Sequence, residues 1–91
     1  MAEIPADVRA RLLRDYPGET SFEATRLVES LTCSERVLRS IVFLAAGDFE
    51  QLERFARISE IDWRDVVFWA EYEDYLADEP RRVRSMEDPL P

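Results

Sequence analysis

Apolar residues recur three and four positions apart along most of this chain, which is the spacing of one buried face of an α-helix. Five such stretches are separated by capping residues, glycine and proline, which begin and end helices. The expected helices begin at Pro5, Thr20, Thr32, Asp48 and Asp62. No stretch alternates between apolar and polar residues for long enough to indicate a β-strand. The pattern therefore predicts an all-α fold, a compact bundle of about five short helices.

Local sequence supports these boundaries. Thr20 and Thr32 are each followed three residues later by glutamate, which is the pattern of a capping box. Asp48 and Gln51 suit the start of the fourth helix, and Gly47 suits the end of the third. The apolar positions of the helices predict a core that contains Leu27, Leu31, Leu38, Ile41, Val42, Phe55, Val66, Val67 and Ala70.

The expected fifth helix, residues 62–78, is apolar on two sides. Asp62 suits its N-cap, and Ile61 before the cap can pack onto Val66. One side carries Trp63, Val66, Val67 and Ala70, and the other carries Phe68, Trp69, Tyr72, Tyr75 and Leu76. Because a surface helix needs only one apolar stripe, we expect the first side to face the core. The second side then needs cover from another helix, from the C-terminal tail or from a second molecule.

The chain divides into one helical domain, residues 1–79, and an extended or mobile C-terminal tail, residues 80–91, which contains three prolines and no periodicity. Within the domain, residues 39–45 parallel residues 64–70, so the second to fifth helices can be read as two similar hairpins. Two buried helices with the same packing role would also converge on this pattern. The hairpins loosely resemble helical-repeat units but lack their signatures, so the resemblance implies no function.

Composition limits the classes of function. The chain has 91 residues, enough for one core, and contains no apolar run long enough to span a membrane. Its formal net charge of −8 disfavours nucleic acid or an anionic membrane as a partner. The one concentration of basic residues, Arg9, Arg11, Arg14, Arg36 and Arg39, lacks interleaved aromatics. Because Cys33 is the only cysteine and the N-terminus has no signal-peptide pattern, we expect the cytoplasm.

Catalytic chemistry is also restricted, because histidine and lysine are absent and every basic residue is arginine. Without them there is no Ser–His or Cys–His pair and no Schiff-base lysine. The acidic residues from Glu71 to Glu79 match no Ca²⁺-loop pattern, and we expect them to be solvated. Cys33 is expected to be a small apolar filler. We therefore expect no enzymatic activity, no cofactor and no metal.

Two functions remain open. The first is a protein-interaction module that self-associates, because aromatic residues with polar tips are favoured at interface centres. Its candidate contact residues are Phe68, Trp69, Tyr72 and Tyr75, flanked by Glu71 and Asp74. The alternative is an acidic inhibitor of the immunity-protein or antitoxin kind, which would bind a basic site on another protein.

Overall fold

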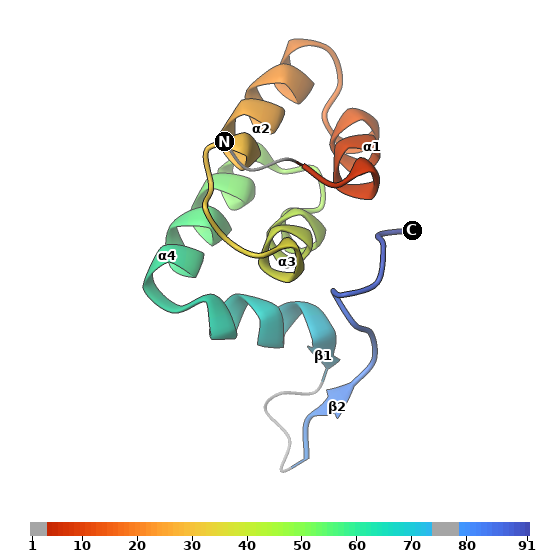
Figure 1. The fold of residues 1–91 in the computed structure, drawn as a ribbon, viewed down its shortest axis with the longest axis vertical. Helices are drawn as coiled ribbons and strands as arrows, with labels where there is room; N and C mark the ends of the chain where they lie inside the picture. The colour runs from red at the N-terminus through yellow and green to blue at the C-terminus, as the bar shows by residue number, and fades with distance from the viewer. Residues whose placement is uncertain (1–3, 74–78) are drawn as a thin grey trace.

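The computed structural model describes residues 4–73 and 79–91, which form a mostly helical globule with four α-helices and one small antiparallel sheet (Figure 1). The elements are α1 (Ala6–Asp15), α2 (Glu19–Glu29), α3 (Glu35–Ala45), α4 (Phe49–Glu71), β1 (Tyr72–Glu73) and β2 (Arg81–Arg82). The predicted compact helical fold is confirmed, but the count of about five helices is slightly off, and the expectation of an all-α fold without strands is corrected by the short strands β1 and β2. The expected fourth and fifth helices are joined in α4, which bends where Asp62 leaves the helical conformation (φ −151°, ψ 95°).

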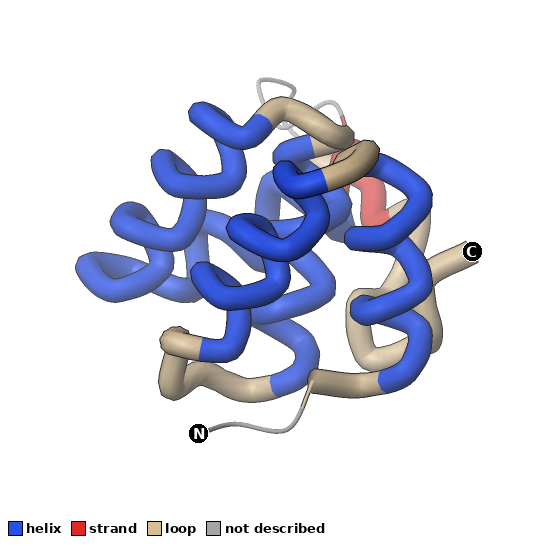
Figure 2. The backbone as a smooth tube through the Cα atoms, turned by 90° about the horizontal axis from the view of Figure 1, so that it is seen from above, coloured by secondary structure: helices blue, strands red, loops and turns tan. Residues whose placement is uncertain are grey.

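The helix buried on all sides is α3, not the C-terminal helix that the aromatic pattern favoured. Figures 1 and 2 show α3 in the middle of the globule, between α1, α2, α4 and the returning C-terminal segment. Six consecutive residues of α3, Val37 to Val42, are buried, so every face of the helix is covered. A helix apolar on one side only would leave some of these positions in water. The largest interface of α3 is with α4.

The predicted core is largely confirmed. Seven of its members are buried: Leu31, Leu38, Ile41, Val42, Val66, Val67 and Ala70. Leu27 and Phe55 are partly buried and pack against this core. Tyr16 of the α1–α2 connection is also fully covered, and burial raises the pKa of its hydroxyl to about 12.

Both expected capping boxes, at Thr20 and Thr32, are replaced by other arrangements. The N-cap of α3 is Ser34, whose hydroxyl accepts a hydrogen bond from the backbone N–H of Val37, so the helix begins after Thr32. The helix α2 begins after Gly18, whose positive φ of 59° suits glycine, and Thr20 already lies inside the helix. Asp48 does cap α4, since its carboxylate accepts from the N–H groups of Glu50 and Gln51.

The helix predicted to run to Asp78 ends at Glu71. The following residues, Tyr72 and Glu73, are extended and pair with Arg82 and Arg81, so a short hairpin replaces the next helical turn. The returning chain occupies the carbonyl groups that a continued helix would use. The N–H of Val83 donates to the Glu71 carbonyl (2.8 Å), and the Arg84 guanidinium donates to the Ala70 carbonyl (2.7 Å). Residues 74–78 lie outside the described part of the chain.

Beyond β2, the C-terminal segment packs against the helices. Met86 and Leu90 are buried in the same core as Ile4 and Val8. The side chain of Arg39 in α3 donates to the carbonyl groups of Met86 (3.5 Å) and Glu87 (3.2 Å). The segment therefore forms part of the wall of the core. Among the described residues, none of the helices is long and apolar enough to cross a membrane.

Candidate protein-interaction site

An open groove of about 620 Å³ lies where the α2–α3 connection faces the bend of α4. We call it the bend groove. It is lined by Ser30, Leu31, Thr32, Cys33, Ser34, Val37, Ser59, Glu60 and Trp63. Leu31 and Val37 belong to the core cluster, so the groove gives a ligand access to apolar surface that is continuous with the core. Its position follows from two local features, the Ser34 cap that starts α3 and the extended backbone at Asp62.

Two large apolar side chains lie exposed at this bend. Ile61 is 87% exposed and Trp63 is 46% exposed. Both positions contradict the expectation from sequence, which placed Trp63 on the core side and packed Ile61 onto Val66. Because Asp62 interrupts the helix, Trp63 begins a new segment at the edge of the molecule, while Val66 one turn later is fully buried. The guanidinium of Arg64 lies over the Trp63 ring, 5.5 Å from the ring centroid.

Three acidic residues line the bend groove or adjoin its lining residues in the chain. Glu60 lines it, Glu35 follows the lining residue Ser34, and Asp62 precedes the lining residue Trp63; all three are exposed. We call these three residues the acidic rim. Within the described residues Glu60 and Asp62 form no ion pair, and Glu35 has only a 3.9 Å contact with Arg39. None of the residues that line the groove is basic, and its one charged lining residue, Glu60, is acidic.

The single thiol of the chain lies in the bend groove but is not activated there. Cys33 is half-buried, and burial raises the pKa of its thiol. A raised pKa keeps the thiol protonated and weakens it as a nucleophile. Cys33 therefore contributes a small apolar surface to the groove.

The predicted contact residues Phe68, Trp69, Tyr72 and Tyr75 are called the aromatic row, and the chain itself covers part of their described surface. Phe68, Trp69 and Tyr72 are each partly buried. Trp69 meets Phe55 edge to face with ring centroids 6.2 Å apart, and Phe68 stacks on Tyr72 with centroids 4.8 Å apart. Tyr75 and Asp74, the other predicted members, lie outside the described residues.

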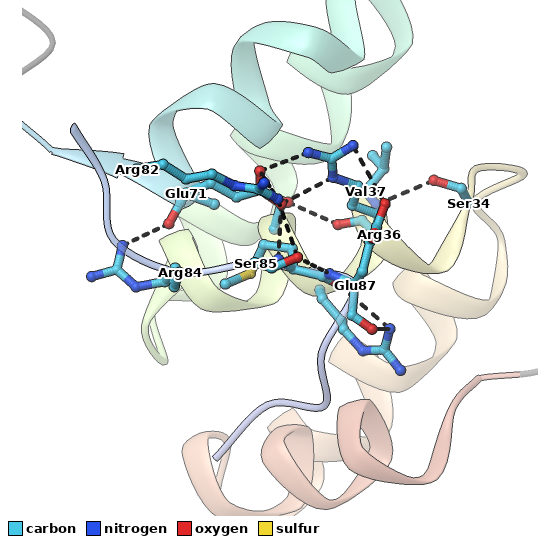
Figure 3. Close-up of polar contacts among 12 residues, drawn as sticks. Ser34, Arg36, Val37, Glu71, Arg82, Arg84, Ser85 and Glu87 are labelled. Carbon is cyan, nitrogen blue, oxygen red and sulfur yellow. Dashed lines mark hydrogen bonds and ion pairs between the residues drawn. The ribbon is translucent and has the colours of Figure 1, made fainter. Parts of the chain in front are cut away.

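Glu71 was expected to be a solvated charge beside this row, and that expectation is wrong. Its side chain is fully buried and lies between α3 and the C-terminal segment (Figure 3). Arg36 of α3 donates to both of its oxygens, at 2.9 and 2.7 Å, and the N–H of Met86 donates at 2.8 Å. Arg82 lies 3.2 Å from the same carboxylate. Glu71 therefore joins three separate parts of the chain rather than facing a partner.

The surroundings of Glu71 keep it ionised. Burial raises the pKa of the Glu71 carboxyl, but the hydrogen bonds from Arg36 and Met86 and the charges of Arg36 and Arg82 outweigh burial and lower it overall. A carboxylate whose oxygens already accept these bonds is poorly suited to proton transfer. The arrangement serves to join segments of the fold.

Asp7 is a second carboxylate that joins separate segments, through Arg39, which lies three residues after Arg36 in α3. Asp7 accepts two hydrogen bonds from Arg39, at 2.9 and 3.1 Å, and one from the N–H of Leu90 at 3.0 Å. The hydrogen bond from Arg39 is the main cause of the lowered pKa of Asp7. With Arg11 and Arg14 on Asp15, four members of the arginine concentration noted in the sequence are bound by carboxylates. The signal available in the sequence was an arginine, Arg39, close to the apolar residues Leu38 and Ile41.

The described residues hold no group of three or more His, Cys, Asp or Glu side chains placed to bind a metal ion. Comparisons with protein-family models, with curated proteins and with solved structures found no match to this chain.

Proposed function

We propose that this chain is a protein-interaction module without catalytic activity of its own, and that the bend groove is its contact surface. The observation that carries the proposal is the exposure of Ile61 and Trp63 beside an open, partly apolar groove. Exposed apolar surface that borders a concave site is typical of interfaces, and tryptophan is enriched among residues that dominate binding energy. We place the module in the cytoplasm, because its lone cysteine forms no internal disulfide.

The absence of catalysis is supported by the state of the groups that could act. Asp7 and Glu71 are held as anions by arginine, and Cys33 is held as a neutral thiol. The chain contains no histidine or lysine to serve as a base near neutral pH. None of these groups is tuned toward the pH at which a general acid or base works best.

Self-association through the aromatic row is the second candidate. The stacked pair of Phe68 and Tyr72 and the neighbouring Trp69 remain partly exposed, so a second copy could bury further aromatic surface there. The two candidates use different surfaces, and a tryptophan marks each of them: Trp63 in the bend groove and Trp69 in the aromatic row.

Site-specific photocrosslinking tests the proposed function. A benzophenone amino acid at Ile61 (87% exposed) is expected to capture a defined protein in the native host, whereas the same probe at Phe22 (66% exposed), outside the groove, is not. Trp63→Ser is expected to abolish the capture, because it removes the side chain at the groove edge. Equal labelling from both positions, or capture that survives Trp63→Ser, would contradict a contact at the bend.

Sedimentation at micromolar concentration measures the self-association of the wild type, Trp63→Ser and Trp69→Ser. A dimer that dissociates in Trp69→Ser but not in Trp63→Ser would support the second candidate and count against the first. Thermal melting of each variant shows whether it is folded, which matters for Trp69 because its ring packs on Phe55.

A further inference from the structure

We infer that the bend groove receives a basic amphipathic helix of a partner protein, with apolar side chains in the groove and arginine or lysine residues on the acidic rim. The inference rests on the proposed function and adds the chemical class of the partner.

The apolar half of the inference comes from the floor and wall of the groove. Leu31 and Val37 are 6% and 3% exposed and form the floor, and the half-exposed Trp63 stands at its edge. The volume of about 620 Å³ lies in the range of ligand-binding pockets, about 300–1,000 Å³. Several side chains on one face of a helix can enter a space of this size, with spacing i, i+3, i+4 and i+7.

The basic half of the inference comes from charge complementarity. The acidic rim, Glu35, Glu60 and Asp62, is exposed, and the lining of the groove contains no basic residue. Two arginines adjoin lining residues in the chain: Arg64 lies over the Trp63 ring, and Arg36 is bound to Glu71. Complementary charge speeds the encounter and rejects partners of like sign. A second copy of this chain, itself at −8, is therefore a poor occupant of the groove.

The architecture favours a helix over an added strand. Strand addition needs an exposed sheet edge, and the strands in the described residues are two residues long and follow the C-terminal end of α4, away from its bend. The bend groove is framed instead by the α2–α3 connection, α3 and α4, whose side chains offer a concave surface to a helical face.

Peptide binding to the full chain tests the inference at 150 mM salt. The probe is a 16-residue helical peptide with leucine at the i, i+3, i+4 and i+7 positions and arginine elsewhere, carrying a fluorescent label. Controls are the same peptide with glutamate in place of arginine and one with serine in place of leucine. Binding is followed by anisotropy and by the rate at which a neutral maleimide alkylates Cys33, the only thiol. The arginine–leucine peptide is expected to bind and to slow alkylation, and both controls are expected to fail.

Matched variants separate the groove from general charge attraction. Glu35→Gln/Glu60→Gln/Asp62→Asn neutralises the acidic rim, and asparagine keeps the capping ability of position 62. Glu19→Gln/Glu23→Gln/Glu50→Gln removes the same charge from exposed positions outside the groove. The rim variant is expected to weaken binding about tenfold and the control about twofold or less. Trp63→Ser is expected to weaken binding, whereas Phe22→Ser is not.

Several results would overturn the inference. Equal weakening by the two triple variants, or unchanged alkylation of Cys33 with bound peptide, would mean that the peptide binds elsewhere by charge. Tight binding of the glutamate peptide would reverse the sign of the partner. If Ile61 captures a protein in the host but the basic peptide does not bind, the inference fails while the proposed function stands. If neither capture nor peptide binding occurs, both fail.

Discussion

Glu71 is a buried charge that connects α4 to α3 and to the C-terminal segment. Its carboxylate accepts hydrogen bonds from Arg36 and from the N–H of Met86 and lies 3.2 Å from Arg82. Neutralisation of the carboxylate leaves the Arg36 guanidinium and the buried N–H of Met86 without the anion that accepts their hydrogen bonds. The lowered pKa of Glu71 and that of Asp7 also couple folding to pH.

Glu71→Gln is expected to lower the free energy of unfolding at pH 7 by about 2–3 kcal/mol. This is below the 3–5 kcal/mol cost of breaking a fully buried pair, because Arg36 is 34% exposed. Urea denaturation followed by circular dichroism measures the change. Glu87→Gln is the control, since Glu87 lies 3.7 Å from the same Arg36 but is 68% exposed. Equal losses in the two variants would contradict the role assigned to Glu71.

Acid is expected to destabilise the wild type. Because the folded-state pKa values of Asp7 and Glu71 are lowered, the stability that they contribute is present above their ordinary values of 3.8 and 4.5. That contribution is lost as the pH falls through the lower folded-state values. The midpoint of unfolding in urea, measured from pH 7 to pH 2.5, is therefore expected to fall less steeply in Glu71→Gln than in the wild type.

At the scale of single elements, α4 is the helix that shapes the bend groove. It consists of two helical segments joined at Asp62, whose carboxylate accepts a hydrogen bond from the N–H of Arg64 at 3.0 Å. Asp62 therefore caps the second segment. It is the residue within α4 whose backbone dihedral angles are not helical. This cap sets the position at which Trp63 is directed to the edge of the molecule.

Asp62→Ala is expected to reduce stability by about 1 kcal/mol, which is typical for loss of an N-cap. Asp62→Asn is expected to cost only a few tenths, because asparagine caps about as well as aspartate. Asp65→Ala, at an exposed position of the same segment, serves as the control. Urea denaturation of the four proteins gives the comparison, and equal losses in the alanine and asparagine variants at position 62 would show that charge rather than capping matters there.

At the scale of the whole molecule, the C-terminal segment completes the core. Met86 is 4% exposed and Leu90 is 8% exposed, and their backbone N–H groups are bound by Glu71 and Asp7 respectively. Arg84 lies over the Phe43 ring at 4.7 Å and donates to the Ala70 carbonyl. The segment thus contacts α1, α3 and α4, and its loss would expose surface on all three.

Met86→Ala is expected to lower the free energy of unfolding by about 2–3 kcal/mol, at the lower end of the range for truncation of a buried methionine. Val83→Ala, in the same segment but 38% exposed, is expected to cost less than about 1 kcal/mol. Thermal denaturation by circular dichroism measures both. Similar melting temperatures for Met86→Ala and the wild type would mean that the segment does not contribute to the stability of the core.

Local sequence determines some helix boundaries and some buried helical faces of this protein. The period of Leu38, Ile41 and Val42 predicted a buried helical face, and Asp48 with Gln51 predicted the start of α4. The break at Asp62 was also predicted from its capping chemistry. These features depend on residues within one or two turns of each other, so neighbouring sequence specifies them.

The tertiary structure decided how charged and aromatic residues are distributed between core and surface. Glu71 is buried because Arg36, 35 positions away, and Met86, 15 positions away, meet it, and no local pattern encodes such a meeting. The helix ends at Glu71 rather than at Asp78 because the returning chain binds the last carbonyl groups. Trp63 is exposed because the bend starts a new segment at the edge of the molecule. Periodicity determines which residues share a face of a helix, but contacts between distant segments determine which face is covered.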